Sequence, residues 1–135
     1  MLLRALGYLW ALPHTLLGAL LLLTWYLPKT LRWRDGALEV VVRRRYLIGG
    51  KWVGGQTWGW IIFFRDVDQQ KRRGLQHHER VHVKQALIGG PYYAFAWLFW
   101  FVTNWATNGF NVRKAYYDIP FEEWARGEYE YTRTR

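Results

Sequence analysis

The chain contains no cysteine among its 135 residues. This absence excludes disulfide bonds, thiol nucleophiles, zinc knuckles and iron–sulfur clusters built from its own side chains. Any metal site therefore has to use histidine, aspartate and glutamate. A chain of this length can bury a real hydrophobic core without covalent cross-links, so we expect one domain over residues 1–135.

Acidic residues are also few. The chain has 10 Asp and Glu against 19 Lys and Arg, a net charge of +9, and the excess lies in residues 29–84, whereas residues 113–135 are balanced. A basic segment can contact anionic lipid, nucleic acid or an acidic partner, or it can be a solvated face. Nucleic acid is not the expected partner, because no nucleic-acid-binding module accompanies the runs Arg43-Arg44-Arg45 and Lys71-Arg72-Arg73.

Apolar residues dominate the N-terminal segment, residues 1–28, which carries no acidic residue. A helix of that length would cross a bilayer core of about 30 Å, but Pro13 would kink or split it. Three interpretations stay open: a kinked membrane helix, an amphipathic hairpin on a membrane surface, and a buried core helix. A signal peptide fits less well, because no small-x-small cleavage site follows.

The next segment, residues 35–65, is typical of β structure. Asp35-Gly36 is a turn signal, LEVVVRRRYLI is rich in β-branched residues, and TWGWIIFF is expected to form another strand. We expect a small antiparallel sheet of two or three strands. The polar stretch DVDQQKRRG that follows is expected to be a loop.

Helices are expected over residues 74–88, 91–107 and 121–131. Gly89-Gly90-Pro91 predicts the end of the first, and Pro120 predicts the start of the last. The middle helix is an aromatic run that is too short to predict as a membrane span, and its expected place is in the core or against the N-terminal segment. The fold class expected from these elements is α+β.

The first of these helices contains the pattern HExxH, at His78-Glu79-Arg80-Val81-His82. Residues four apart lie on the same helix face, so both imidazoles can reach one zinc ion. Glu79 projects beside that face, where it can take a proton from metal-bound water. His77 lies off the stripe and is expected to flank the site. The competing interpretation is a basic surface helix with incidental histidines.

A catalytic zinc usually has three protein ligands. No histidine follows His82, so a downstream third ligand has to be a carboxylate. Glu122 is the preferred candidate, because it starts a helix and the aromatic segment before it can turn the chain back. The candidates considered are Asp118, Glu122, Glu123, Glu128 and Glu130.

These motifs resemble the gluzincin group of zinc metallopeptidases, and more narrowly small uncharacterised bacterial and phage proteins. The resemblance rests on HExxHxxQ (residues 78–85), Gly90-Pro91-Tyr92 and Pro120-Phe121-Glu122-Glu123-Trp124-Ala125. It implies a zincin-like minimal metallopeptidase domain that binds Zn²⁺. It also implies His78, His82 and Glu122 as ligands, Glu79 as the base, and Gln85 as a residue beside the ligands or facing the substrate.

The chain departs from the gluzincin pattern at Arg126, where many members have an aspartate that orients a ligand histidine. Asp66, Asp68 and Asp118 are the available acidic substitutes. Peptidases of this type also use a side chain that stabilises the oxyanion. The candidates are Tyr116 and Tyr117, with Tyr92 and Tyr129 as further choices.

The function expected from the sequence is a zinc-dependent peptidase-like hydrolase, with metal-bound water activated by Glu79 and an unknown peptide or protein substrate. The alternative is a membrane-surface or phage structural protein whose metal site is structural or absent. Such a protein would contact a membrane through residues 1–28 and the Trp-rich segments. The expected location is membrane-associated or cytoplasmic.

Overall fold

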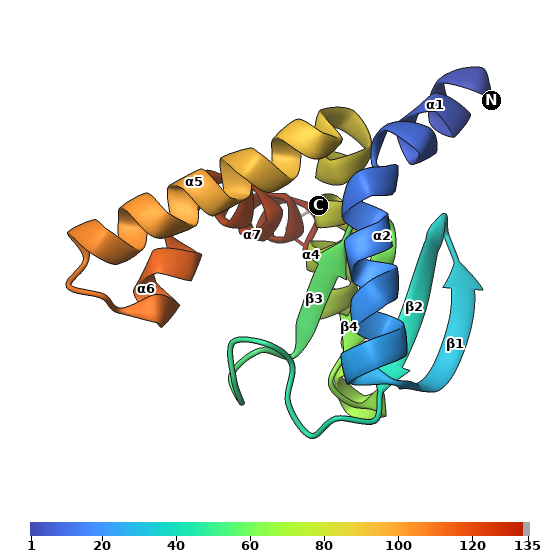
Figure 1. Ribbon diagram of the computed structural model, residues 1–135, viewed down its shortest axis with the longest axis horizontal. Coiled ribbons are helices and arrows are strands. Elements are labelled where there is room, and N and C mark those ends of the chain that lie inside the picture. Colours follow the sequence, from blue (N-terminus) through green and yellow to red (C-terminus); the bar gives the residue numbers. More distant parts are fainter. Residues whose placement is uncertain (134–135) are drawn as a thin grey trace.

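The computed structural model describes the backbone of residues 1–133 and the side chains of residues 1–128, and over this range the fold class is α+β. Helices surround one four-stranded sheet (Figure 1). In chain order the elements are α1 (Leu2–Trp10), α2 (Leu12–Leu21), the π-helical turn η1 (Leu22–Tyr26), β1 (Pro28–Arg34), β2 (Ala37–Val42), β3 (Gly55–Trp58), β4 (Ile61–Phe64), α3 (Val67–Lys71), α4 (Arg73–Gly89), α5 (Pro91–Thr107), α6 (Val112–Tyr117) and α7 (Pro120–Arg133).

The sheet has the strand order β1-β2-β4-β3 and is mixed. A two-residue turn at Asp35-Gly36, where both φ angles are positive, joins β1 to β2 as an antiparallel hairpin. β2 and β4 are parallel, so the expectation of a purely antiparallel sheet is wrong. The long connection after β2 returns the chain to the same end of the sheet before β3 and β4 form, and this makes the parallel pairing possible.

The expected single strand TWGWIIFF is also wrong, because Gly59 and Trp60 turn the chain and divide it into β3 and β4. Gly59 has a φ of 62°, and a Cβ atom there would lie 1.9 Å from the Thr15 hydroxyl of α2. The close approach of α2 therefore requires glycine at this turn, which a pattern of strand-forming residues does not reveal.

Three elements were not expected from the sequence: β1, α3 and the six-residue helix α6. β1 has mostly exposed side chains and is an edge strand, so it lacks the apolar alternation of a buried strand. α3 is a five-residue helix in the polar stretch predicted as a loop. The Asp66 carboxylate caps it by accepting a hydrogen bond from the Gln69 amide at 2.8 Å.

Helices cover both faces of the sheet: α2 lies in front of it and α4 behind it in Figure 1. Alternate strand residues serve the two faces, because side chains along a strand point to opposite sides. Val40 and Phe63 join the core beneath α2, whereas Val41 and Phe64 join the core beneath α4. The sheet is therefore buried on both faces in its centre.

The N-terminal apolar segment forms two helices that meet at Ala11. Pro13 lies in the first turn of α2, where a missing N–H costs nothing, and it does not kink the middle of a longer helix. In the part of the chain that the structure describes, no single helix is long and apolar enough to cross a membrane. Two pairs of consecutive helices each have the combined length and apolar composition of a span, but both pairs are bent. The bend is 56° between α1 and residues 12–26, and 119° between α4 and α5.

A buried carboxylate, Glu39 of β2, connects four elements of the fold. It accepts hydrogen bonds from Arg32 of β1 at 2.6 Å, from Gln70 of α3 at 3.2 Å, and from Arg80 of α4. Arg80 is one of the unspecified positions within HExxH, and its guanidinium fixes the helix against the sheet. Glu39 therefore helps to position the helix that carries the histidines.

Replacement of Glu39 by glutamine should lower the free energy of unfolding by about 2 kcal/mol, because the buried group loses its charge-assisted hydrogen bonds to the half-exposed Arg32 and the partly buried Arg80. Chemical denaturation measures this change. Glu123→Gln, an exposed carboxylate on α7, is the matched control and should change stability by less than about 0.5 kcal/mol. Equal stability of the two variants would contradict a positioning role for Glu39.

Candidate metal centre

His78 and His82 lie one turn apart on α4 and point toward the same space. Their ring centroids are 4.7 Å apart, the rings are nearly perpendicular, and the two Nε2 atoms are 3.1 Å apart. His82 is buried and His78 is mostly buried. The i, i+4 spacing on a helix produces this pairing directly.

Glu122 brings the third polar atom from the first turn of α7. Its Oε2 atom lies 3.0 Å from His78 Nε2 and 3.1 Å from His82 Nε2. The three side chains are the group in the described part of the chain whose ligand atoms all lie close enough to hold one metal ion. Ligands of a tetrahedral zinc at about 2.0–2.1 Å lie roughly 3.3 Å from one another, so the observed triangle fits zinc with a small expansion.

Gln85 fixes the protonation of His82. Its amide nitrogen donates to the Phe121 carbonyl at 3.0 Å, which directs its oxygen toward His82 Nδ1 at 2.8 Å. His82 must then carry a proton on Nδ1. When the ring is neutral, the Nε2 lone pair faces the carboxylate of Glu122 and the other imidazole, an arrangement that a cation between them satisfies.

Gln85 makes the kind of contact with a histidine ring that the gluzincin pattern assigns to an aspartate at position 126. It lies one turn beyond His82 on the same stripe and is buried, with its oxygen at 2.8 Å from His82 Nδ1. Asp66, one of the expected acidic substitutes, caps α3 instead. Arg126 donates to the Tyr117 carbonyl and its guanidinium lies 5.1 Å from the Tyr117 ring centre.

Sequence reasoning missed two residues of α5 that contact the cluster. The Tyr93 hydroxyl lies 3.2 Å from His82 Nδ1, and the Trp97 indole N–H is 3.5 Å from Glu122 Oε1. They are four residues apart, so one face of the aromatic helix closes the site. The four-residue spacing of Tyr93 and Trp97 was the only sign in the sequence that they share a helix face. The chain has ten tryptophans and nine tyrosines, so such a pair does not stand out.

Electrostatics tie His82 to Glu122. Burial by itself would lower the pKa of His82, but the charge of Glu122 and its hydrogen bond outweigh burial and raise the pKa to about 9. For Glu122, burial favours the neutral form, and the two histidines reverse this and hold its pKa well below the usual range. Without a metal, the cluster is therefore an ion pair at neutral pH.

Glu79 lies beside the cluster without belonging to it. It is buried, and the Thr57 hydroxyl of β3 donates to its Oε2 at 2.6 Å. A Cβ atom on Gly55 would lie 2.7 Å from Glu79 Oε1, so glycine at this position makes room for the carboxylate. Burial raises the pKa of Glu79, against the lowering effect of the nearby histidines. A buried carboxylate held in one orientation beside the cluster is placed to accept and return a proton.

A cleft of about 720 Å³ opens over these groups. His78, Glu79 and Glu122 form part of its wall, and the two expected tyrosines, Tyr116 and Tyr117, line it as well. Burial raises the pKa of Tyr116 well above its usual value, and the charges of Glu122 and Glu79 add to this, so its hydroxyl stays protonated as a donor. Three arginines complete the basic side of the cleft: Arg72, Arg73 and Arg126.

The other sequence candidates lie elsewhere. Glu128 contacts Lys84 at 3.8 Å and Trp124 at 2.7 Å and does not join the cluster. Tyr92 is largely exposed on α5. Neither Asp118, Glu123 nor His77 is part of the metal-ligating group. The side chains of Tyr129 and Glu130 lie outside the described residues.

Replacement of Gln85 by leucine should lower zinc affinity by about 10–100-fold, because His82 loses the acceptor that orients its ring. Competition with a chromophoric chelator measures the dissociation constant. Gln69→Leu, the same change on α3, should leave the affinity within about twofold. Unchanged affinity in Gln85→Leu would show that the amide does not orient the ligand.

In the presence of a chelator, the protein should lose stability as the pH rises from about 6.5 to above 9. The pKa of His82 is raised on folding, so its contribution is complete below 6.5 and disappears as the pH passes about 9. The size is on the order of 3 kcal/mol, since a tenfold change in proton affinity corresponds to about 1.4 kcal/mol. The pKa of Glu122 is lowered on folding, so the stability that Glu122 contributes is complete above about pH 4.5 and is lost as the pH falls below that value.

Denaturation midpoints between pH 6 and pH 9.5 test this pH dependence, with His82→Gln as the variant that should lack it. Burial lowers the pKa of His14 from 6.5 to about 4, so His14 makes stability rise with pH up to about 7.5 and has no effect above it; the fall in stability between about pH 7.5 and 9.5 therefore reports on His82. A wild-type curve that is flat between pH 6 and 9.5 would contradict the ion pair.

Comparison of the chain with protein-family models, with curated proteins and with solved structures gave no match.

Proposed function

We propose that the chain is a zinc-dependent peptidase-like hydrolase with a zincin-like arrangement, in which α4 is the active-site helix. The observation that carries the proposal is the meeting of three ligand atoms within about 3 Å of one another beside a buried carboxylate that is not a ligand. A structural zinc site is usually closed by four ligands, whereas three protein ligands leave a position for chemistry. The gluzincin resemblance points the same way.

The residues have distinct parts in this proposal. His78, His82 and Glu122 would hold the ion, which when bound supplies Lewis-acid chemistry and lowers the pKa of water. Glu79 takes a proton and returns it to the leaving amine, and its raised pKa suits both steps. Thr57 and Gly55 hold Glu79 in one orientation. Tyr116 supplies a neutral O–H donor to the cleft for the developing negative charge.

The substrate in this proposal is an extended peptide. β3 is the outer strand of the sheet and carries Gly55 and Thr57 against Glu79, so a peptide added to its edge would pass the cluster. The edge available to a peptide here is that of β3, because β4 is enclosed between β2 and β3. Arg72, Arg73 and Arg126 favour peptides with acidic side chains.

The test is metal content combined with hydrolysis. The purified protein should hold about one zinc per chain, and His82→Ala and Glu122→Ala should each lose most of it, because two ligands bind zinc weakly. Glu79→Gln should keep the metal and lower peptide cleavage by at least about 100-fold, since it removes the proton carrier alone. A library of fluorogenic peptides that includes acidic sequences provides the activity readout.

Glu123→Gln is the matched control for Glu122, one residue away on α7 and exposed, and it should keep both metal and activity. Absence of metal in the wild-type protein after incubation with zinc would refute the proposal. Metal at full occupancy without cleavage of any peptide would favour the alternative function, a surface protein with a structural metal site.

A further inference from the structure

The second helix of the chain buries one side against the fold and leaves the opposite, leucine-rich side uncovered. His14, Thr15 and Gly18 are its buried residues, and a Cβ atom on Gly18 would lie 2.6 Å from Trp58 Cβ. The other side carries Leu16, Leu17 and Leu20, each more than half exposed. An exposed leucine-rich side of this kind is typical of a surface that contacts a partner or a membrane.

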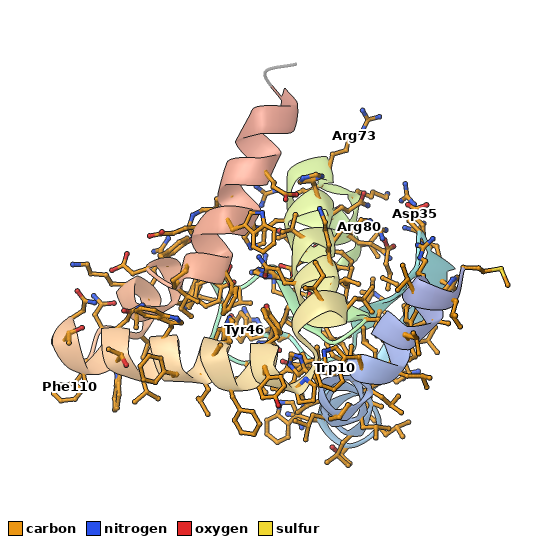
Figure 2. The ribbon with its side chains drawn as sticks, turned by 90° about the horizontal axis from the view of Figure 1, so that it is seen from above. Trp10, Asp35, Tyr46, Arg73, Arg80 and Phe110 are labelled. Atoms are coloured by element: carbon orange, nitrogen blue, oxygen red, sulfur yellow. The ribbon has the colours of Figure 1, made fainter. Side chains whose placement is uncertain are left out.

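A second apolar stripe on α5 continues this uncovered side. Tyr92, Phe95 and Phe99 lie three and four residues apart on its outer side and are each more than 60% exposed. The Trp10 ring at the end of α1 meets the Tyr92 ring at 5.9 Å, which joins the two stripes. In Figure 2 α5, α1 and α2 lie along the same side of the molecule, at the lower edge. We call the outer sides of α1, α2 and α5 the apolar face.

Charge at this face has one sign. The three helices that build it, Leu2–Trp10, Leu12–Leu21 and Pro91–Thr107, contain one charged residue, Arg4, and no aspartate or glutamate. A surface that is apolar within and negatively charged at its border complements the face, and an anionic lipid bilayer has this chemistry.

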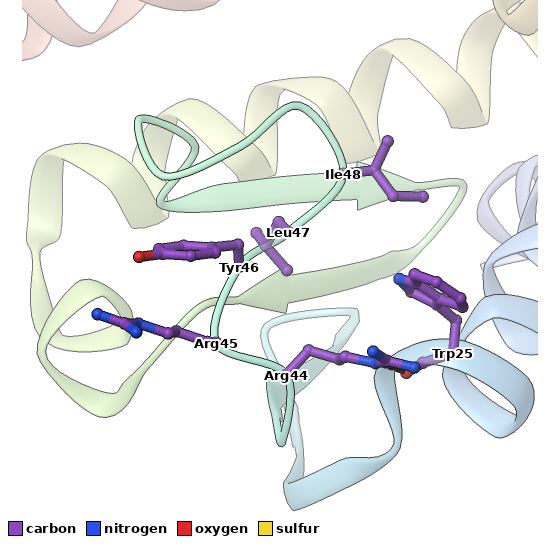
Figure 3. Close-up of a pocket in the computed structure, with 6 residues that line it drawn as sticks. All are labelled: Trp25, Arg44, Arg45, Tyr46, Leu47 and Ile48. Carbon is purple, nitrogen blue, oxygen red and sulfur yellow. Dashed lines mark hydrogen bonds between the residues drawn. The ribbon is translucent and has the colours of Figure 1, made fainter.

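The loop after β2 places Arg44 next to the exposed Trp25 of η1 and Arg45 next to Tyr46. The Arg44 guanidinium lies 4.1 Å from the centre of the Trp25 ring and donates to the Trp25 carbonyl at 3.0 Å, and Arg45 lies 5.3 Å from the Tyr46 ring (Figure 3). These residues line a hollow of about 350 Å³. Tryptophan, tyrosine and arginine together are typical of the headgroup level of a membrane.

We propose that the apolar face docks in the plane of an anionic bilayer, with Arg44 and Arg45 on lipid phosphates and without a membrane-spanning helix. The sheet packed beneath α2 keeps that helix at the surface of the domain, so it lies along the membrane. α4 runs from the side of Trp10 to the opposite side at Arg73 (Figure 2), which places the cleft on the aqueous side. The inference does not depend on the proposed hydrolase function.

Vesicle co-sedimentation of the full chain tests this docking. The wild-type protein should pellet with vesicles of phosphatidylcholine and phosphatidylglycerol and bind pure phosphatidylcholine vesicles several-fold more weakly. Leu17→Glu and Phe95→Glu should each weaken binding about tenfold or more, because each puts a charge where an apolar side chain enters the lipid. Arg44→Gln should weaken binding to the anionic vesicles about fivefold.

The matched controls lie on α3, on the opposite side of the sheet. Val67→Glu and Lys71→Gln make the same kinds of change on exposed positions and should bind as the wild type does. Circular dichroism of each variant checks that it is folded. Leu17→Glu lies on α2 and Phe95→Glu on α5, so if one variant fails to fold, the other still tests the proposal.

Three outcomes would overturn the proposal. One is a wild-type protein that stays in the supernatant with both kinds of vesicle. Another is binding that Leu17→Glu and Phe95→Glu weaken no more than Val67→Glu does. The third is a lipid-free dimer that Leu17→Glu dissociates in sedimentation velocity, with no vesicle binding, which would assign the face to a second copy of the chain. Because the assay works equally in chelator, failure of docking and failure of the metal site are separate results.

Discussion

The contact between α4 and the first turn of α7 is the interaction on which the candidate site depends. It places a buried carboxylate oxygen within 3.1 Å of two imidazole nitrogens, and the mutual attraction raises the pKa of His82 and lowers the pKa of Glu122. A protonated His82 or a cation between the three atoms balances the carboxylate charge. The hydrogen bond from Gln85 to the Phe121 carbonyl supports the same contact and fixes the imidazole tautomer, so the helix pair and the protonation state of the site are coupled.

The sheet contributes the second requirement, a carboxylate held close to the cluster but away from its centre. Thr57 and Gly55 of the edge strand meet Glu79, while Arg80 on the next position of α4 binds Glu39 in the middle of the sheet. Adjacent residues of one helix are thus fixed by two different strands. Rotation of α4 would break both contacts, which explains how a domain of this size can hold a buried carboxylate in one orientation without any disulfide.

The molecule is built with two unlike sides, and α4 connects them. Its N-terminal half carries the histidines toward a cleft bordered by arginines, whereas its C-terminal end leads through Gly90 into the aromatic helix of the apolar face. The positive φ of Gly90 turns the chain by 119° there, and the Trp10 indole packs where a side chain at this position would project. This turn lets one chain segment serve a polar site and an apolar surface.

The sequence by itself determined the features that depend on local spacing. HExxH fixed two imidazoles on one helix face, Gly89-Gly90-Pro91 ended that helix, Pro120 began α7, and Asp35-Gly36 set the hairpin, because each follows from backbone geometry over a few residues. Only the tertiary structure decided which of five carboxylates lies against the histidines, since that depends on how α5 and α6 return the chain. It also decided the parallel pairing of β2 with β4, the division of TWGWIIFF beneath Thr15, and the contacts of Thr57 and Tyr93 with Glu79 and His82. These are long-range contacts between residues that carry no mutual signal in a single sequence.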